Sequence, residues 1–284
     1  MAKTQVFPGV LYVVATPLGN ALDLSPRAAA VLGGAGLILA EDTRRTKRLL
    51  AEAGIAGARM LSLHEHNEAG RVAQVLEFVT GGGEAALVSD AGTPLLSDPG
   101  FELVRACRRQ GVTVVPVPGP CAVTTALSVS GLAPHPFTFL GFLPRKAGDV
   151  KKLFTTHGRL GHTLVFFERK DRLVASLALA AEVLGDREFV VAREMTKTFE
   201  EFIPGRLADL SVLDRELLGE ITVVIGPAAQ TVRHGEDEAE TVYAEEAAAG
   251  GKPREVARRA AARLAGWSAT EVYERFFLAG KKTS

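Results

Sequence analysis

The sequence predicts an α/β protein that folds as two α/β domains followed by a small helical unit. Short β-branched runs alternate with segments of helical periodicity over the first 227 residues, which is typical of α/β domains. After Gly226-Pro227 the composition changes, first to an acidic stretch and then to a basic one. A chain of 284 residues is long enough to bury two separate cores.

The first domain, residues 1–131, is predicted to contain a mostly parallel sheet, because its strands are continuously apolar and alternate with helices. Ser25 followed by Pro26 indicates an N-cap with proline in the first helical turn. Asn67 is a candidate N-cap before a helical stretch from Arg71 to Thr80. The expected strands are Val10–Ala15, Leu37–Ala40, Met60–Leu63, Ala85–Val88 and Thr113–Val117.

Residues that bind ligands or form turns follow all five of these strands. In open α/β sheets, ligands bind beyond the carboxyl ends of the strands. The loop Ser89-Asp90-Ala91-Gly92-Thr93-Pro94 combines backbone amides and one carboxylate with a glycine that permits close approach of the backbone. We therefore expect a small-molecule site built around this loop. The other strand ends read Thr16-Pro17-Leu18-Gly19-Asn20, Glu41-Asp42-Thr43-Arg44, His64-Glu65-His66-Asn67 and Pro118-Gly119-Pro120-Cys121.

The second α/β domain is predicted over residues 132–227. Its strands are spaced more widely and are amphipathic, which favours a mixed sheet. A helical segment from Arg172 to Leu184 lies between two of them. The expected strands are Phe137–Gly141, Thr163–Phe167, Phe189–Ala192, Glu201–Ile203 and Ile221–Ile225.

The last part of the chain is predicted to be an acidic linker followed by a basic helical unit. Residues 228–251 hold six acidic residues and end in an Ala- and Gly-rich run, so we expect a linker. Residues 252–284 contain a basic segment from Lys252 to Ala265 and a second helix from Ala269 to Leu278, with Ser268 as N-cap. A role in nucleic-acid binding and a role as a solvated helix pair or dimer contact both stay open.

Composition excludes several classes of protein. Lys and Arg (33) balance Asp and Glu (33), so no overall field favours nucleic acid or a membrane, and the 6% aromatic content disfavours a protein that reads bases by stacking. The only two cysteines, Cys107 and Cys121, form no Cys-x-x-Cys pair, and the six histidines are scattered, so we expect no metal site. The N-terminal residues lack the apolar core of a signal peptide, and prolines interrupt the apolar stretch over 110–144. We expect a soluble, cytoplasmic enzyme.

Familiar nucleotide and hydrolase motifs are missing. Gly33-Gly34-Ala35-Gly36 follows a helix and precedes a strand, the reverse of a dinucleotide-binding loop. Gly251-Lys252-Pro253 and Gly280-Lys281-Lys282 lack the upstream glycine of a P-loop, and no Gly-x-Ser-x-Gly elbow occurs. These absences leave the Ser89 loop and its companion strand ends as the chemical signal.

Taken in order along the chain, these strand ends and three later motifs resemble the tetrapyrrole methylase superfamily. Within it the resemblance is closest to the 2′-O-methyltransferases that act on a cytidine in the decoding region of 16S ribosomal RNA. It implies two α/β domains with S-adenosylmethionine in the cleft between them, a homodimer, and the small ribosomal subunit or its RNA as partner. The later motifs are Pro116 to Ala122, Gly141 to Lys146 and Arg193 to Thr198.

The resemblance also implies site residues. Candidates for contact with the RNA substrate are Asp42, Arg44, His64, Lys146 and Lys197, the cations being candidates for its phosphates. A general base would help to activate a ribose hydroxyl, but Asp42, His64, Glu65 and His66 are equally open candidates and none is assigned. His64 and His66 alternate along a segment expected to be extended, so at most one should enter the cleft. The residues implied to contact the cofactor are Leu18, Asp90, Gly92, Thr93, Cys121, Ala122 and Phe167.

The chain departs from the family pattern at one edge of the second domain. In Phe167-Glu168-Arg169-Lys170-Asp171-Arg172, Glu168 and Arg172 match, whereas Arg169 stands where the family usually has a small residue and Asp171 where it usually has His. Two alternative functions are kept. One is a tetrapyrrole C-methyltransferase acting on a corrin or porphyrin precursor, which the Glu41 and Thr196 motifs and the basic C-terminal unit disfavour. The other is an RNA-binding module without catalysis, which predicts no binding of cofactor.

Overall fold

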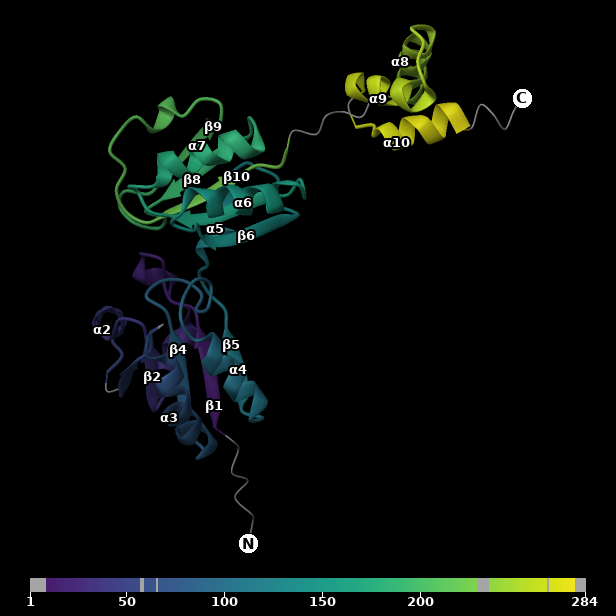
Figure 1. Cartoon of the computed structure of the whole chain (residues 1–284). Coiled ribbons are helices and arrows are strands. Elements are labelled where there is room, and N and C mark those ends of the chain that lie inside the picture. Colours follow the sequence, from purple (N-terminus) through teal and green to yellow (C-terminus); the bar gives the residue numbers. More distant parts are fainter. Residues whose placement is uncertain (1–8, 57–58, 65, 229–234, 265, 279–284) are drawn as a thin grey trace. The chain divides into compact units, whose positions relative to one another are not determined.

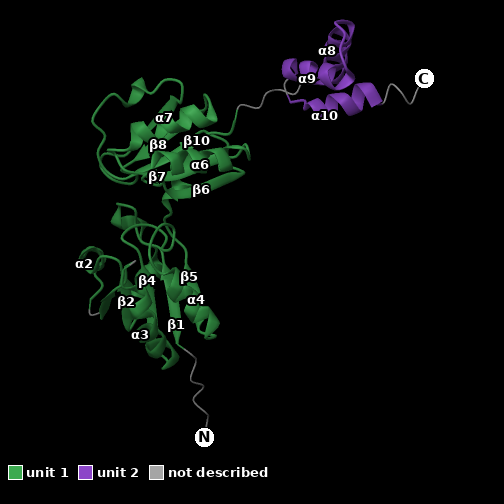
Figure 2. Ribbon diagram, viewed as in Figure 1, with its two compact units in different colours: residues 1–228 green, residues 229–284 purple. Residues whose placement is uncertain are grey.

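The computed structural model describes residues 9–56, 59–64, 66–228, 235–264 and 266–278. The chain divides into two compact units, residues 1–228 and 229–284 (Figure 2). The first unit holds two five-stranded sheets and the second is helical (Figure 1). Among the described residues, no helix is both long and apolar enough to cross a membrane.

The first sheet is parallel throughout, with strand order β3-β2-β4-β1-β5. Helices cover both of its faces, as the continuously apolar strands predict, because alternate residues of one strand enter different cores. In β4, Leu87 packs with the core under α3 and α4, and Val88 packs with the core under α1 and α2. The strands are β1 (Val10–Val14), β2 (Leu37–Ala40), β3 (Met60–Ser62), β4 (Glu84–Val88) and β5 (Thr113–Val117). The helices are α1 (Pro26–Gly34), α2 (Thr43–Glu52), α3 (Glu68–Thr80) and α4 (Phe101–Arg109), with a 3₁₀ turn η1 (Ala21–Asp23).

Of the two N-caps expected in the first domain, one is confirmed and the other differs. The Ser25 hydroxyl accepts the Ala28 amide at 3.0 Å, with Pro26 in the first turn of α1. Asn67 stands at the N-cap of α3 but makes no cap bond. Its Oδ1 accepts the His64 amide at 2.9 Å instead, because the backbone at Asn67 is already helical and turns the side chain back toward β3.

The second sheet is mixed, as expected, with order β6-β7-β10-β8-β9. Only β6 and β7 pair in parallel, and the other neighbours are antiparallel. Helices α6 (Ala147–Gly158) and α7 (Leu173–Leu184) pack on one face, where Phe154, Phe166 and Leu177 form part of the core. The strands are β6 (Phe137–Phe142), β7 (Thr163–Glu168), β8 (Glu188–Arg193), β9 (Glu201–Arg206) and β10 (Ile221–Ile225), with a 3₁₀ turn η2 (Ser211–Leu213).

Helix α5 (Ala122–Val129) belongs to the second sheet, although it precedes the expected domain boundary at residue 131. Its residues Val123, Ala126 and Leu127 share a core with Val165 and other residues on the face of that sheet opposite α6 and α7. The change from one sheet to the other therefore falls at Pro118 to Cys121. The turn after β5 is thus both a strand end of the first domain and the entry to the second.

The C-terminal unit is a cluster of helices, which corrects the expected linker. Most of residues 228–251 form α8 (Glu236–Ala248), which packs against α9 (Pro253–Arg263) and is followed by α10 (Ala269–Val272) and a π-helical turn η3 (Tyr273–Leu278). Acidic residues of α8 stabilise this arrangement, because Glu246 pairs with Arg259 and Arg263 at 2.8 Å. Ser268 caps α10 as expected. Residues 229–234 of the expected linker, and Gly280-Lys281-Lys282, lie outside the described residues.

Candidate functional site

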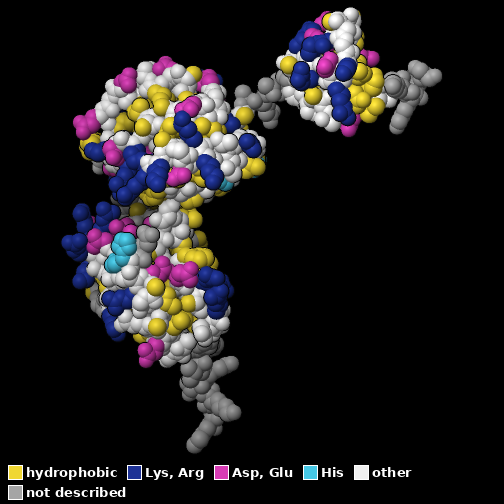
Figure 3. All heavy atoms as spheres, in the orientation of Figure 1, with side chains coloured by type: hydrophobic (Ala, Val, Ile, Leu, Met, Phe, Trp, Pro, Cys, Tyr) yellow, Lys and Arg dark blue, Asp and Glu magenta, His cyan; other side chains and the backbone are white. Residues whose placement is uncertain are grey.

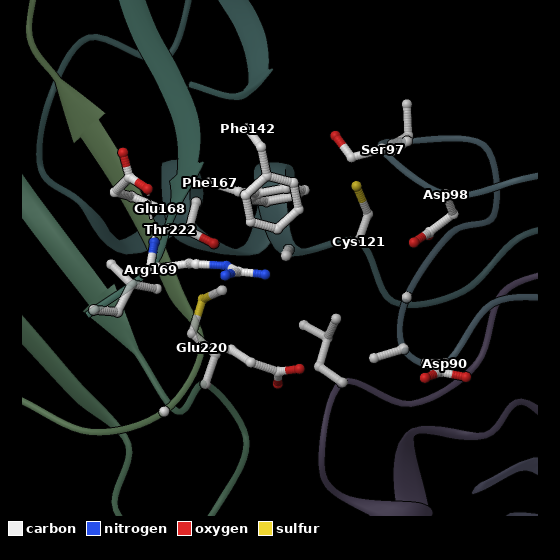
Figure 4. A pocket seen from close by; sticks show the side chains of 18 of the residues that line it. Asp90, Ser97, Asp98, Cys121, Phe142, Phe167, Glu168, Arg169, Glu220 and Thr222 are labelled. Atoms are coloured by element: carbon white, nitrogen blue, oxygen red, sulfur yellow. Dashed lines mark hydrogen bonds between the residues drawn. The ribbon is translucent and has the colours of Figure 1, made fainter. Parts of the chain in front are cut away.

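A cavity of about 510 Å³ opens at the carboxyl ends of the strands of the first sheet and is closed on its other side by β7, β10 and the loops around them (Figure 4). Its volume lies within the range of about 300–1,000 Å³ typical of small-molecule sites. The structure brings all seven residues expected to contact the cofactor to this cavity: Leu18, Asp90, Gly92, Thr93, Cys121, Ala122 and Phe167.

The loop after β4 is fixed by the ends of its neighbouring strands. Gly92 exchanges two backbone hydrogen bonds with Thr16 at 2.9 and 3.0 Å, and the Thr93 hydroxyl donates to the Pro120 carbonyl at 3.0 Å. Gly92 has φ +80°, and a Cβ atom there would lie 3.1 Å from Leu18 Cδ2. Glycine is therefore needed both for the backbone conformation and for the close approach of Leu18.

The second domain supplies an aromatic wall. Phe167 packs edge-on against Phe139 with ring centroids 5.0 Å apart, and Phe142 lies 5.4 Å from Phe167. Phe142, Met195 and Thr222 also line the cavity and are not among the residues expected from the sequence. Phe142 and Met195 lie inside two of the matched motifs, so the motifs themselves were the signal that could have found them. The result is a largely apolar wall facing the polar loop of the first domain.

Carboxylates gather on the first-domain side. Asp90 accepts the Asp42 amide at 3.0 Å and lies 3.5 Å from Arg45. The carboxyl of Asp98 points toward the cavity (Figure 4). Burial, together with the negative charges of Glu41 and Asp90, raises the pKa of Asp98 to about 7, against a hydrogen bond from Ser89. Burial and the charge of Asp90 likewise raise the pKa of Glu41.

Asp98 is not among the site residues expected from the sequence. Its burial depends on how the loop from Ser89 to Gly100 folds back over the sheet edge, and residue spacing does not reveal this. The only indication in the sequence was that the segment from Ser89 to Gly100 follows the carboxyl end of a predicted strand, where ligands bind in such sheets.

The five expected RNA-contact residues do not line the cavity. Asp42 caps α2 by accepting the Arg44 amide at 2.8 Å, and this bond holds the pKa of the Asp42 carboxyl below its usual range. Arg44 has a 91% exposed side chain, and Lys146 lies exposed at the N-terminal end of α6. These positions leave both cations accessible to a large ligand.

The histidine segment turns instead of extending, which corrects the expectation that His64 and His66 face opposite sides. Strand β3 ends at Ser62, and the His64 carbonyl accepts the amides of Asn67 and Glu68. The two imidazole rings consequently contact each other, with centroids 6.1 Å apart. The Asn67 side chain contacts His64 Nε2 at 3.0 Å. Neither histidine lines the cavity, and Glu65 lies outside the described residues.

Lys197 is held between two carboxylates and is therefore less available to RNA than expected. Its ammonium contacts Glu194 at 3.0 Å and Glu220, a cavity residue, at 2.8 Å. Burial alone would lower the pKa of Lys197, but its bonds to Glu220 and Glu194 raise it overall. Its stem packs on Gly19, where a Cβ atom would lie 2.3 Å from Lys197 Cγ. Lys197 thus fastens the second domain to the loop after β1.

Beside Lys197, the segment joining β8 to β9 carries backbone strain. Glu194 and Thr196 both have positive φ, at 49° and 67°. Such conformations are unfavourable for residues other than glycine and persist only where surrounding contacts impose them. The Thr196 hydroxyl accepts the Asn20 amide at 3.2 Å, which is one such contact. The strained segment therefore places Met195 in the cavity wall.

Comparison with known proteins agrees with this architecture. The tetrapyrrole (corrin/porphyrin) methylases match residues 10–211 as a family. "Ribosomal RNA small subunit methyltransferase I" of Xylella fastidiosa is 45% identical over 242 residues, covering 84% of this chain and 88% of that protein. The protein of the same name from Escherichia coli O157:H7 is 48% identical over 193 residues, covering 68% of this chain and 67% of that protein.

Solved structures show the same fold. The methyltransferase CobJ superposes with a TM-score of 0.60 at 20% identity, covering 80% of this chain and 97% of its own. Uroporphyrin-III C-methyltransferase from Thermus thermophilus, solved in complex with S-adenosylhomocysteine, superposes with a TM-score of 0.56 at 21% identity, covering 77% of this chain and 97% of its own. With the matched family and the relatives above, the two α/β sheets and the cavity between them establish that the chain belongs to the tetrapyrrole methylase family.

Proposed function

We propose that this protein is an S-adenosylmethionine-dependent methyltransferase that methylates the ribose 2′-oxygen of a cytidine in the decoding region of 16S ribosomal RNA. The observation that carries the proposal is the identity of 45% over most of the chain with a protein named for methylation of small-subunit ribosomal RNA. The structural neighbours named uroporphyrin-III C-methyltransferase share only 21–23% identity with this chain, so their similarity to it concerns the fold alone.

The cavity fits the proposed cofactor. A flat aromatic base and an apolar thioether stem suit the wall of Phe167, Met195 and Cys121, and a polar ribose suits the amides and carboxylate of the opposite loop. Gly92 presents bare backbone at the same place. S-adenosylmethionine supplies a methyl group activated by a sulfonium. We propose Leu18, Asp90, Gly92, Thr93, Cys121, Ala122 and Phe167 as the residues that hold it.

The chain contributes to methyl transfer mainly through environment and alignment. Apolar walls such as Leu18 and Phe167 exclude water, which would favour a reaction in which a sulfonium donor loses its positive charge. Hydrogen bonds to Thr16 and Pro120 fix the loop after β4, and a fixed loop would hold the methyl donor in one position. Holding donor and ribose in place lowers the entropy cost of bringing the two reactants together. The released ribose proton needs an acceptor, and we assign that role to no residue.

The RNA would approach across exposed cations outside the cavity. Figure 3 shows Lys and Arg side chains gathered over α2. Arg44 belongs to this helix, and Lys146 lies at the start of α6. We propose both as phosphate contacts. Lys197 is proposed instead as a positioning residue, because its two carboxylate partners satisfy its charge. We further propose that the substrate is 16S RNA within the small ribosomal subunit in the cytoplasm, and that the enzyme acts as a homodimer.

The proposal is tested by mapping ribose methylation in 16S RNA. Small subunits from cells lacking this protein should gain one cytidine 2′-O-methyl group when they are incubated with the protein and S-adenosylmethionine. Absence of that modification, with methyl transfer to a corrin or porphyrin precursor in a parallel reaction, would support the C-methyltransferase alternative. Calorimetry that detected no binding of S-adenosylmethionine would exclude both enzymes.

A further inference from the structure

Arg169 extends its guanidinium from the end of β7 into the cavity (Figure 4). It lies in an exposed loop, and it is the position at which the chain departs from the small residue usual in the family. Lys170 follows it and also lines the cavity. The loop therefore adds positive charge to a cavity whose other charged lining residues are acidic.

Two of the acids that line the cavity near Arg169 are already engaged with other groups, and a third, Asp171, belongs to the same loop as Arg169. Glu168 accepts the Ser176 hydroxyl at 2.6 Å and the backbone amide of Arg169 at 2.8 Å. Glu220 pairs with Lys197 at 2.8 Å. Within the part of the chain that the structure describes, no ion pair or hydrogen bond involves the guanidinium of Arg169.

Three other cations near the cavity are committed to partners in the protein, whereas Lys170 lines the cavity beside Arg169. Arg172 donates to the carbonyls of Leu143 and Pro144 at 3.2 and 2.5 Å, and Arg45 lies 3.5 Å from Asp90. Lys197 is held by its two glutamates. Arg169 thus differs from its neighbours in presenting a planar, permanently charged donor group to whatever enters the cavity.

The acidic lining narrows the kind of anion that Arg169 can meet. Asp90 and, above about pH 7, Asp98 would repel an anion that moved deeper, so the partner must be anionic at the rim and neutral at the reacting atom. An RNA ribose meets this condition, because a phosphate is attached to the 3′-oxygen, on the carbon next to the one that carries the 2′-hydroxyl. The carboxylate of the cofactor is a less suitable partner, because five of the seven proposed cofactor contacts come from strand ends of the first domain, namely Leu18, Asp90, Gly92, Thr93 and Cys121.

We propose that Arg169 binds the backbone phosphate beside the target ribose and so positions the 2′-hydroxyl for methyl transfer. This inference rests on the proposed function. Arginine suits the task because its fork can donate two hydrogen bonds to phosphate oxygens, whereas lysine acts as a point charge. Arg169 would therefore bind substrate from a position where the family usually has a small residue.

The experiment compares the full-length wild type with Arg169→Ser, Arg169→Lys and Arg109→Ser, the last a control at the exposed end of α4 before β5. Arg169→Ser should weaken binding to small ribosomal subunits about tenfold and reduce the slope of log affinity against log salt concentration by roughly 0.7–0.9. Methyl transfer at saturating RNA should also slow, because the ribose is less well aligned. Affinity for S-adenosylhomocysteine in calorimetry should stay unchanged. Arg169→Lys should keep the salt slope and recover part of the affinity, and Arg109→Ser should match the wild type.

Two results would overturn the inference. Weaker cofactor binding with unchanged RNA affinity and salt slope would assign the guanidinium to the cofactor carboxylate. Unchanged binding of both ligands would show that Arg169 contacts neither. Failure of the wild-type protein to bind the cofactor or to methylate the subunit would refute the proposed function itself. Differences between the variants and the wild type test only the role of Arg169.

Discussion

Replacing Asp98 with Asn should stabilise the folded protein and do so more strongly at high pH. In the folded state, burial and the charges of Glu41 and Asp90 raise the pKa of Asp98 to about 7 from its ordinary value of 3.8. Between these two values the folded state holds a proton that the unfolded state has released. The free energy of unfolding therefore falls as pH rises through this window, and the full penalty is present above pH 7.

The size of the effect follows from the shift. Each pKa unit corresponds to about 1.4 kcal/mol. Raising the pH from about 5 to about 8.5 crosses roughly two pKa units of this window. The loss in free energy of unfolding caused by Asp98 is therefore at most about 3 kcal/mol over this range. Asp98 is only partly buried, so solvent reduces this figure. We expect Asp98→Asn to gain about 1–3 kcal/mol more stability at the higher pH than at the lower one.

The assay must report on the first unit. The single tryptophan, Trp267, lies in the C-terminal unit, so its fluorescence would follow the wrong transition. Urea unfolding monitored by circular dichroism, with hydrogen exchange of the β4 amides to assign the transition, avoids this problem. Asp214→Asn controls for removal of an exposed carboxylate. A stabilisation by Asp98→Asn that is independent of pH, or larger at pH 5, would refute the electrostatic account of this cluster.

Three further substitutions test the site. Gly92→Ala should cost about 1–2 kcal/mol of stability and weaken cofactor binding in calorimetry, because φ is +80° and the new methyl group meets Leu18; full retention of both would show that the loop adapts. Arg44→Ala should slow methylation of small subunits several-fold and leave S-adenosylmethionine binding intact, and an unchanged rate would remove Arg44 from the RNA surface. Lys197→Met should weaken cofactor binding while keeping the salt dependence of RNA binding, because it frees Glu194 and Glu220; a reduced salt slope with normal cofactor affinity would make Lys197 an RNA contact after all.

Strand positions in the first domain could be predicted from the sequence, because a strand buried on two faces has to be apolar at every position. Leu37–Ala40 is such a run, and it forms β2 with Leu39 and Ala40 in different cores. The position of the loop Ser89 to Pro94 beside the cavity could be predicted for a related reason, since the carboxyl ends of parallel strands meet at one edge. Local pattern and topology were sufficient for these features.

Features that depend on packing between distant segments could not be predicted. The sequence of α5 shows an apolar helix but not the sheet that it covers, and only the structure places Val123 against Val165. Six acidic side chains in residues 228–251 favoured the prediction of a linker. In the structure, ion pairs between Glu246 and arginines of α9 stabilise a helix there. The ion pairs of Lys197 with Glu194 and Glu220 likewise depend on the fold, because residue spacing does not show which carboxylates face the ammonium.

The most direct test of the account is the fate of a labelled methyl group. Small ribosomal subunits that lack the modification should be incubated with the full-length protein and methyl-labelled S-adenosylmethionine, and the 16S RNA then digested to nucleosides. The account predicts about one labelled methyl group per subunit, recovered as 2′-O-methylcytidine. Label on a base, on protein or on no product, from a protein that binds the cofactor, would contradict it.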